Sequence, residues 1–351
     1  MADFRGRSPA SIPEVFLVHI HGMGDAVPPN GSALDSLHDS AMLGAGCAIQ
    51  SATVVQNAAI CTEHFRLRLR VAAFGPSSPG QFVHIGRHQS VNPVLNGMCA
   101  ERPMREGPLL RRAFSIAGLR RAAGGVELDV IYRVVGAGTR WMSTLPPGDV
   151  LSVLGPQGNH FPIHPDRLHA WLIAGGVGVP PMLWLAEALR AAQRETIAFC
   201  GAQRRDLLAL TIDGSCPLDP SARRAVLSAA EFRLHGAAVI VSTDDGSIGF
   251  RGHVGQALTA YAEASRHNPQ EVVVYTCGPE RMMHFVAEFC AKRGLLAYAC
   301  MERAMACGTG MCQSCVVPVR DEADVEGWRY RLCCTDGPVF DASSILWNPP
   351  R

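Results

Sequence analysis

The chain has 351 residues, of which 48% are hydrophobic and 18% are charged, and its formal net charge is +1. Such a chain is long enough for two or three domains with cores of their own. The balanced charge excludes the basic footprint of a nucleic-acid-binding protein, and no run approaches the roughly 18 apolar residues of a membrane span. We therefore expect no nucleic acid and no membrane as partners.

Residues 1–52 are rich in glycine, serine, alanine and proline and show no sustained period. Their one apolar run, at 15–20, is short and is followed by His21 and Gly22 rather than by a small-residue cleavage site. We expect a poorly ordered N-terminal extension that is not a secretory signal, and a cytoplasmic location for the protein.

Residues 53–165 are predicted to form short strands. The stretch "HFRLRLRVAAF" at 64–74 alternates apolar and charged residues, as a half-buried strand does. Further strands are predicted at 79–85, 126–136 and 148–155. Frequent turn signals and few helical periods favour a small antiparallel β-barrel.

Residues 166–295 alternate between buried strands and amphipathic helices, which predicts a parallel sheet with crossover helices in an α/β domain. The predicted strands are 170–176, 196–202, 237–245 and 271–279, and the predicted helices are 180–193, 255–265 and 280–294. Residues 296–351 show little regular periodicity and are predicted to form a third, small C-terminal domain.

The cysteines of this last segment carry the most specific signal. The chain has 13 cysteines, and clustered cysteines in a protein without an export signal more often hold a metal than form disulfides. Cys307, Cys312 and Cys315 have the spacing C-x4-C-x2-C, and Cys333 and Cys334 follow at a distance. This is the ligand spacing of a plant-type [2Fe–2S] cluster, held by four thiolates on two irons.

The glycines between these cysteines fit the same interpretation. Gly308 and Gly310 allow unusual backbone dihedrals, so that one loop wraps around a cluster and turns N–H groups towards its sulfurs. The competing interpretation is a structural zinc site, which usually takes two separate cysteine pairs. The single triplet favours iron–sulfur, but spacing does not decide between Cys333 and Cys334 as the fourth ligand.

Two glycine turns follow strands of the predicted parallel sheet and open helices. The first, "IAGGVGVPP", contains Gly175, Gly176 and Gly178, and the second, "YTCGPERMM", contains Cys277 and Gly278. Such turns bind a pyrophosphate at a helix N-terminus, although a tight packing turn is the alternative for the first one. Cys277 is either a plain buried thiol or a neighbour of a nicotinamide.

A third stretch, "LLRRAFSIAG", places two arginines, an aromatic residue and a serine around one predicted strand of the barrel. An arginine in this position can clamp a diphosphate, and the backbone near Ser115 can meet a planar ring. The alternative is an exposed basic edge strand.

Together these stretches resemble a known family. "RRAFSI" resembles the flavin motif of the ferredoxin–NADP reductase superfamily, and "AGGVGVPPM" and "CGPERMM" resemble its two nucleotide turns. "ERAMACGTGMCQSCVVPV" with "CCTDGPVFDA" resembles the electron-transfer subunits of the NAD-linked class of dihydroorotate dehydrogenase. The resemblance covers roughly residues 53–345.

The resemblance implies roles for particular residues. In the family the fourth cluster ligand directly precedes x-x-G-P-V-F, which implies Cys334 and leaves Cys333 as a neighbour. "STDDGSIGFRGHV" resembles a family segment near the pyridine nucleotide, which places Asp244 towards a ribose. The implied FAD-binding residues are Arg112, Phe114, Ser115, Gly138 and Thr139.

The residues do not settle NAD against NADP by themselves. Arg204 and Arg205 lie near the end of the second parallel strand, where they either read a 2′-phosphate or form a solvated turn. The resemblance implies NAD.

The function implied by the resemblance is electron transfer in pyrimidine biosynthesis. The chain would pass electrons between NAD(H), FAD and a [2Fe–2S] cluster and an FMN-containing catalytic partner, within a heterotetramer. The partner would oxidise dihydroorotate to orotate, so no catalytic residue is assigned in this chain. The alternatives are a related subunit of a sulfhydrogenase or a ferredoxin:NADP oxidoreductase, and a non-redox zinc-binding protein on a reductase fold.

Overall fold

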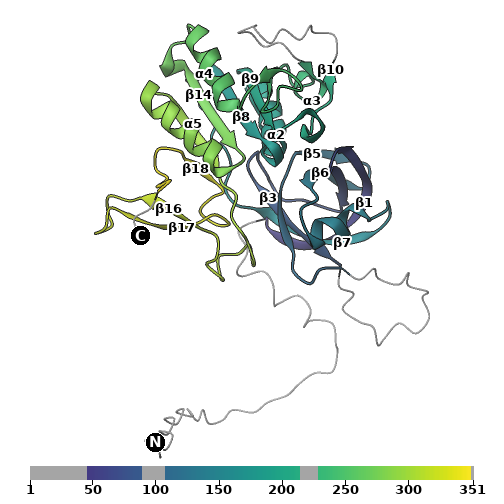
Figure 1. Ribbon diagram of the computed structural model, residues 1–351. Coiled ribbons are helices and arrows are strands. Elements are labelled where there is room, and N and C mark those ends of the chain that lie inside the picture. The colour runs from purple at the N-terminus through teal and green to yellow at the C-terminus, as the bar shows by residue number, and fades with distance from the viewer. Residues whose placement is uncertain (1–45, 89–106, 214–227, 349–351) are drawn as a thin grey trace, which may run out of the picture. The chain divides into compact units, whose positions relative to one another are not determined.

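The computed structural model describes residues 46–88, 107–213 and 228–348 (Figure 1). Residues 1–45, the main part of the predicted N-terminal extension, lie outside the described residues. Residues 48–52 of that extension belong instead to the first strand. Within the described ranges, no helix is both long enough and apolar enough to cross a bilayer.

The first sheet is antiparallel at every strand pair, as the sequence predicts. Its strand order is β4-β3-β7-β1-β2-β6-β5. The strands are β1 (Ala48–Cys61), β2 (His64–Val71), β3 (Phe82–Arg87), β4 (Arg112–Ser115), β5 (Gly118–Ala122), β6 (Gly125–Arg133) and β7 (Val150–Gln157).

Alternation along β2 explains why this segment is a strand. Leu67 and Leu69 are fully buried among the apolar side chains of the sheet. The intervening Arg68 forms an ion pair with Asp129 on β6, with Nε 2.8 Å from Oδ1. One face of the pleat therefore supplies the core, and the other carries paired charges.

The strands β4 and β5, at the two ends of the strand order, are separated along the chain by only two residues. Ile116 N donates to Gln81 O beside the β3–β4 pair, and Ala117 N donates to Asp129 O beside the β5–β6 pair. One continuous stretch of chain thus hydrogen-bonds to both β3 and β6.

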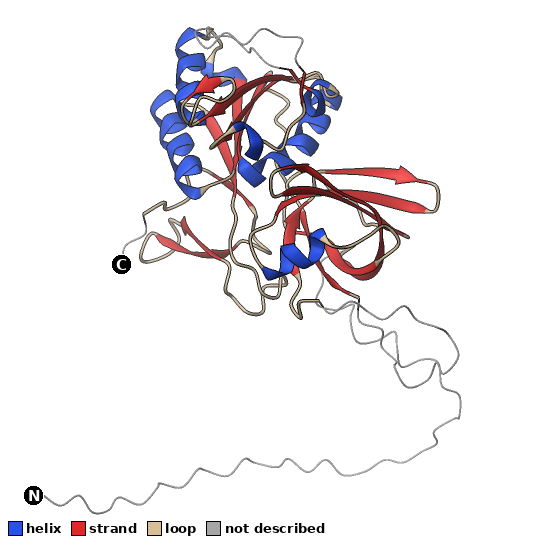
Figure 2. Ribbon diagram, turned by 45° about the vertical axis from the view of Figure 1, so that its right-hand side comes forward, coloured by secondary structure: helices blue, strands red, loops and turns tan. Residues whose placement is uncertain are grey.

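The second sheet has the order β13-β12-β9-β8-β14-β15-β18 and is parallel except between β15 and β18. Helices lie on both sides of it (Figure 2). The strands are β8 (His169–Gly175), β9 (Glu195–Ala202), β12 (Ala238–Thr243), β13 (Phe250–Arg251), β14 (Val272–Cys277), β15 (Leu296–Cys300) and β18 (Val339–Asp341). The helices are α2 (Val179–Ala191), α3 (Ala230–Arg233), α4 (Val254–Ala264) and α5 (Glu280–Arg293).

The continuous apolar run of β8 is buried on both faces. Leu172 packs in the cluster that contains the apolar residues of α2, whereas Trp171 and Ile173 pack with those of α4 and α5. A strand covered by helices on both faces has no polar face, which is why its sequence does not alternate. The predicted α/β organisation is confirmed.

Two strands of this sheet come from the segment predicted to be a separate C-terminal domain. β15 continues the sheet beside β14, and β18 returns to pair with β15, matching Cys300 with Val339. Between them the chain forms the cysteine loop and the hairpin β16 (Val316–Arg320) and β17 (Trp328–Leu332). The exact domain boundaries stay a prediction.

The remaining elements are short. A short helix α1 follows β6, and one-turn 3-10 helices occur after β8 and in two connections. These helices are α1 (Ala137–Ser143), η1 (Gly176–Gly178), η2 (Arg205–Leu207) and η3 (Pro269–Glu271). Two further strands of two residues each, β10 (Ile212–Asp213) and β11 (Ser228–Ala229), pair with each other.

Candidate functional site

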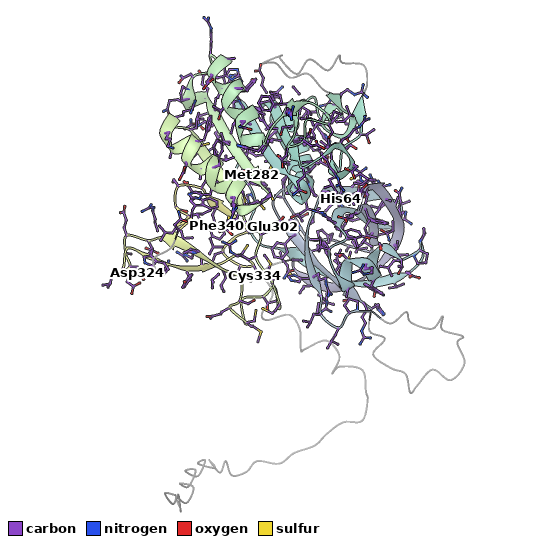
Figure 3. All side chains as sticks on the ribbon, in the orientation of Figure 1. His64, Met282, Glu302, Asp324, Cys334 and Phe340 are labelled. Atoms are coloured by element: carbon purple, nitrogen blue, oxygen red, sulfur yellow. The ribbon has the colours of Figure 1, made fainter. Side chains whose placement is uncertain are left out.

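The structure brings the four predicted cluster ligands together from two segments. Cys307, Cys312 and Cys315 lie in the loop between β15 and β16, and Cys334, labelled in Figure 3, follows β17. The amides of Thr309 and Cys312 donate to Cys307 Sγ at 3.4 Å, and the amide of Cys334 donates to Cys315 Sγ at 3.4 Å. The side chains of Cys307 and Cys312 also interact with each other, as do those of Cys315 and Cys334, so the four thiols form two pairs.

The two glycines of the cysteine loop adopt the predicted unusual dihedrals. Gly308 has φ +75° and Gly310 has φ +84°, a region that residues with a Cβ enter only with strain. Gly308 also has no room for a side chain, because a Cβ there would lie 2.6 Å from His84 Nδ1 and 2.8 Å from Gln157 Nε2. Its backbone is thus packed directly against the antiparallel sheet.

Hydrogen bonds favour thiolates at one pair of cysteines. The Ser314 hydroxyl is the main cause that lowers the pKa of Cys312 to about 6. Burial alone would raise the pKa of Cys307, but amide donors from Cys312 and Thr309 lower it overall. At the second pair, burial and the neighbouring Cys315 raise the pKa of Cys334 to about 12. A bound cation reverses such a shift, because metal coordination deprotonates a thiol.

The structure distinguishes the two adjacent cysteines. Cys333 Sγ donates to the carbonyl of Met301 at 3.2 Å and is fully buried. Cys334 instead lies against Cys315. The geometry agrees with Cys334 as the fourth ligand and gives Cys333 a structural contact.

These residues fit a [2Fe–2S] cluster better than a single ion. Such a cluster takes two thiolates on each iron, which matches two sulfur pairs with amide groups donating to one sulfur of each pair. The preference for iron–sulfur over zinc rests on this pairing and on the ligand spacing in the sequence.

A cavity of about 440 Å³ lies where the antiparallel sheet meets the start of the cysteine segment. On the sheet side it is lined by the predicted flavin residues Arg112, Phe114, Ser115 and Thr139. Its opposite wall is the stretch from Cys300 to Arg303, with Met305 and Pro338. The cavity is thus built from two parts of the chain that are distant in sequence.

Arg112 and the turn at α1 are closely packed. A side chain at Gly138 would overlap the Arg112 guanidinium, so glycine is what lets this cation lie against the helix start. Thr139 Oγ1 accepts hydrogen bonds from the amides of Val135 at 2.9 Å and Gly136 at 3.2 Å. The predicted pair Gly138–Thr139 therefore holds the turn that supports Arg112.

A second cavity, of about 360 Å³, opens at the carboxyl ends of β8, β9 and β14. Gly175, Gly176 and Gly278 line it, as predicted for nucleotide turns, together with Asp244. Gly278 has φ +146°, and a Cβ on it would lie 2.9 Å from the Gly175 carbonyl. The two turns thus approach each other more closely than side chains allow.

Gly178 and Cys277 lie behind this cavity rather than in its wall. A side chain at Gly178 would overlap the Cys277 carbonyl, so this glycine joins the two turns. Cys277 is 1% exposed, and hydrogen bonding with Cys300, followed by burial, raises the pKa of its thiol. The member of this thiol pair that lines the first cavity is Cys300.

The two cavities share three residues, Arg133, Val177 and Glu302. Figure 3 labels Glu302 at this junction, with His64 and Met282 from the wall of the second cavity. The Glu302 side chain opens into the cavities but is surrounded by protein atoms, and this desolvation raises the pKa of its carboxyl. Ligands in the two cavities would therefore meet at this carboxyl group.

The charges near the second cavity bear on the choice of nucleotide. Arg204 Nε is bonded to Asp206 Oδ1 at 2.6 Å, and the Arg205 amide donates to Ser247 Oγ. Neither arginine lines the cavity, whereas Asp244 does. The acidic side chain facing the cavity suits a ribose hydroxyl and opposes a 2′-phosphate.

Sequence reasoning missed two residues that hold the cysteine segment. Gln157 Nε2 donates to the Gly308 carbonyl at 2.7 Å, and Asn159 Nδ2 donates to the carbonyls of Asp336 at 2.9 Å and Val339 at 2.8 Å. Both belong to "GPQGNHF", which shows itself in the sequence only as a glycine-rich corner. Contacts across 151 and 180 positions leave no local signal.

Comparisons with known proteins agree with this geometry. Residues 302–346 match the model of the iron–sulfur cluster binding domain of dihydroorotate dehydrogenase B, and residues 172–288 match the oxidoreductase NAD-binding domain. The first match contains all four predicted cluster ligands. The second contains both nucleotide turns.

Curated relatives decide the family. The "Dihydroorotate dehydrogenase B (NAD(+)), electron transfer subunit" of Desulforamulus reducens is 30% identical over 77% of this chain and 87% of the relative. The subunit of the same name from Streptococcus mutans is 32% identical over 85% of this chain and 98% of the relative. The chain belongs to this family. The resemblance noted in the sequence is thereby confirmed.

A solved structure shows that the fold extends beyond the family. The chain of an NADH-dependent reduced ferredoxin-NADP oxidoreductase superposes with a TM-score of 0.64 at 24% identity, covering 85% of this chain and 90% of that one. At this identity the likeness shows the fold, a mixed α/β protein with an NAD-binding domain. For the present chain, the roles of the site residues and the closure of the antiparallel sheet into a barrel stay predictions.

Proposed function

We propose that this chain is the electron transfer subunit of an NAD-linked dihydroorotate dehydrogenase B, and that it conducts electrons between NAD(H) and a catalytic partner. One observation carries the proposal beyond family membership. The nucleotide cavity and the flavin cavity share Glu302, and the same short stretch continues into the cysteine loop at Cys307. Three redox groups bound at these places would be neighbours in the order that electron transfer needs.

FAD occupies the first cavity in this proposal. Arg112, supported by Gly138 and Thr139, holds the diphosphate, and Phe114 and Ser115 border the ring. The antiparallel sheet forms a barrel closed through residues 112–122, which is supported by the hydrogen bonds of this stretch to both β3 and β6. The bound flavin supplies the exchange between the two-electron chemistry of NAD(H) and the one-electron chemistry of an iron–sulfur cluster.

NAD(H) occupies the second cavity. Gly175, Gly176 and Gly278 let the backbone approach the pyrophosphate, and Gly178 keeps the turn beside Cys277 in place. The Cys277 thiol hydrogen-bonds with the Cys300 thiol, which lines the flavin cavity. Asp244 and the ion-paired Arg204 explain a preference for NAD over NADP.

Cys307, Cys312, Cys315 and Cys334 hold the [2Fe–2S] cluster. Cys312 is exposed, and the neighbouring Met311 is 73% exposed, so the loop presents one cysteine pair to solvent. This supports a partner that receives or delivers electrons at the loop. We propose the FMN-containing catalytic subunit as that partner, in a cytoplasmic heterotetramer. Dihydroorotate oxidation then belongs to the partner.

Anaerobic purification of the chain tests this function. We expect flavin absorption and, after reduction, the rhombic EPR signal of a [2Fe–2S] cluster. Cys307→Ser should remove the EPR signal and leave the flavin bands. Cys61→Ser is the matched control, because the Cys61 thiol contacts the Thr62 carbonyl and its charged neighbours are Asp206 and Arg133 rather than the cluster cysteines. A colourless protein that contains zinc would contradict the proposal.

The partner and the chemistry are tested separately. Co-expression with an FMN-containing dihydroorotate dehydrogenase chain should give a complex that reduces NAD⁺ with dihydroorotate, and Cys307→Ser should abolish this reduction. A subunit that binds all three groups but supports only ferredoxin-linked reduction of NADP⁺ would favour the alternative ferredoxin:NADP oxidoreductase.

A further inference from the structure

One peptide group of the cysteine loop is hydrogen-bonded on both sides. It joins Gly308 to Thr309. Its N–H group, on Thr309, donates to Cys307 Sγ at 3.4 Å. Its carbonyl, on Gly308, accepts a hydrogen bond from Gln157 Nε2 at 2.7 Å. Accepting at the carbonyl polarises a peptide and makes its N–H a stronger donor.

The chain of hydrogen bonds continues one step further into the antiparallel sheet. His84 Nδ1 lies 2.6 Å from Gln157 Oε1, and both side chains are buried, at 0% and 6% exposure. They come from adjacent strands, because β3 pairs with β7. A buried pair in a region of low dielectric interacts more strongly than the same pair in water.

The acceptor at the end of the chain fixes the direction of every bond. The Gly308 carbonyl can only accept, so the NH₂ group of Gln157 must face it. The Gln157 oxygen then faces His84, and His84 Nδ1 must carry the proton. His84 therefore donates to Gln157, Gln157 donates to the peptide, and the peptide donates to Cys307.

Packing holds this arrangement in register. A Cβ on Gly308 would lie 2.6 Å from His84 Nδ1 and 2.8 Å from Gln157 Nε2, so the loop rests directly on the two side chains. Two apolar side chains would fill the same space without the cost of burying polar groups. The polar pair is thus not explained by packing alone.

We infer that His84 and Gln157 are positioning residues that raise the reduction potential of the cluster through the Gly308–Thr309 peptide. The inference rests on the proposed function, since it requires a cluster on Cys307. Reduction adds negative charge to the cluster, and hydrogen bonds to its sulfurs favour the more negative state. Weakening the Thr309 donor should therefore make the cluster harder to reduce.

The test is a potentiometric EPR titration of the full chain carrying its cofactors. Gln157→Met keeps the side-chain length but removes both hydrogen bonds. At a fixed potential we expect the ratio of reduced to oxidised cluster to fall about threefold to tenfold, which is about 30 to 60 mV for a one-electron couple. His84→Phe keeps a ring and leaves the bond from Gln157 to Gly308, so its shift should have the same sign and be smaller.

The matched control is Gln81→Met. Gln81 also lies next to β3, and its Nε2 donates to a backbone carbonyl, that of Gly158, at 2.8 Å, but this bond does not lead to a thiol. The control should leave the potential unchanged. If Gln157→Met fails to retain the cluster, the titration of His84→Phe decides.

The outcomes separate the two proposals. A wild-type chain without a [2Fe–2S] signal overturns the proposed function and this inference with it. A wild-type chain with the signal, and unchanged potentials in the variants that retain it, overturns only the role of His84 and Gln157. Equal shifts in Gln157→Met and Gln81→Met would also overturn it, because they would show a general effect of altering the sheet.

Discussion

The cysteine loop and the two nucleotide turns both depend on glycine, but for different reasons. In the cysteine loop, Gly308 and Gly310 have left-handed dihedrals that bend the chain around its own thiols. In the nucleotide turns, Gly178 and Gly278 allow two separate segments to touch, since side chains there would meet the backbone of Cys277 and Gly175. The first region is shaped by local conformation, and the second by contact between distant parts of the chain.

Substitutions in the two regions should therefore affect different properties of the protein. Changes in the cysteine loop should affect the cluster first and the fold second. Changes where the nucleotide turns meet should affect the fold first, because they force apart strands β8 and β14 of the central sheet. Three pairs of substitutions test this division, and one further substitution tests the carboxyl group where the two cavities meet.

Adjacent cysteines should differ most. Cys334→Ser should lose the cluster, because the replaced thiol lies against Cys315. Cys333→Ser should retain it, because the Cys333 thiol donates to the Met301 carbonyl and the Cys333 amide, which donates to the Cys315 carbonyl, is unchanged by the substitution. Iron and sulfide content and the EPR signal after reduction measure the difference. Cluster loss in Cys333→Ser with full retention in Cys334→Ser would reverse the ligand assignment.

The two loop glycines should differ next. Gly308→Ala combines strain from the positive φ with overlap against His84 and Gln157, a cost of about 2–4 kcal/mol. Gly310→Ala has the same kind of strain, but its Cβ would lie 3.2 Å from the Thr335 methyl, so we expect about 1–2 kcal/mol. Cluster content and the midpoint of chemical unfolding check this order. Equal losses would show that conformation alone decides.

At the nucleotide turns, Gly178→Ala should mainly lower stability. Its side chain would overlap the Cys277 carbonyl, and we expect a loss of about 1–3 kcal/mol in the free energy of unfolding. A Cβ at position 176 would face open space, so Gly176→Ala should lower the free energy of unfolding by only about 1 kcal/mol, because of its φ of +53°. We expect Gly176→Ala to change the KM for NADH more than Gly178→Ala does. Denaturant unfolding and steady-state kinetics on the same samples separate the two effects. The comparison fails if Gly176→Ala is the less stable protein.

The smallest effect is expected at Glu302. The protein atoms around the Glu302 side chain desolvate it and raise the pKa of this carboxyl in the folded protein, so the folded state binds its proton more tightly than the unfolded state does. Stability is therefore lost as pH rises from the unfolded pKa, about 4.3, through the raised folded value. Glu302→Gln should raise the Tm slightly at pH 7 and leave it unchanged near pH 4. A lower Tm at pH 7 would show that the charged form is stabilised instead.

Much of this architecture could be predicted from the residues. The alternation of Leu67 and Leu69 with arginines predicts a half-buried strand, and the apolar run 170–176 predicts a strand buried on both faces. Cys307, Cys312 and Cys315 predict a cluster because their spacing lies within one loop. Each of these patterns lies within one short segment of the chain, so it can be identified from the sequence alone.

The remaining features depend on pairings that no local pattern encodes. β15 and β18 are short, and their facing residues Cys300 and Val339 lie 39 positions apart, so nothing in either strand predicts that both join the parallel sheet. The spacing of the cysteines does not choose between Cys333 and Cys334. The resemblance to the family implies Cys334, and the contact of Cys333 with the Met301 carbonyl, which agrees with that choice, is visible only in the fold. Glu302 stands inside the recognised motif, but its position between two cavities needs the fold.

The pairing of β15 with β18 has a consequence for how the cluster segment relates to its host. The chain leaves the parallel sheet after Cys300 and re-enters it at Val339, so the intervening residues form an insertion whose two ends are held together by strand hydrogen bonds. Such an insertion does not need its metal to bring its ends together, because the sheet has already closed the loop and met that entropic cost. The relative position of the two ends of the cluster segment is therefore set by the parallel sheet, with or without a bound cluster.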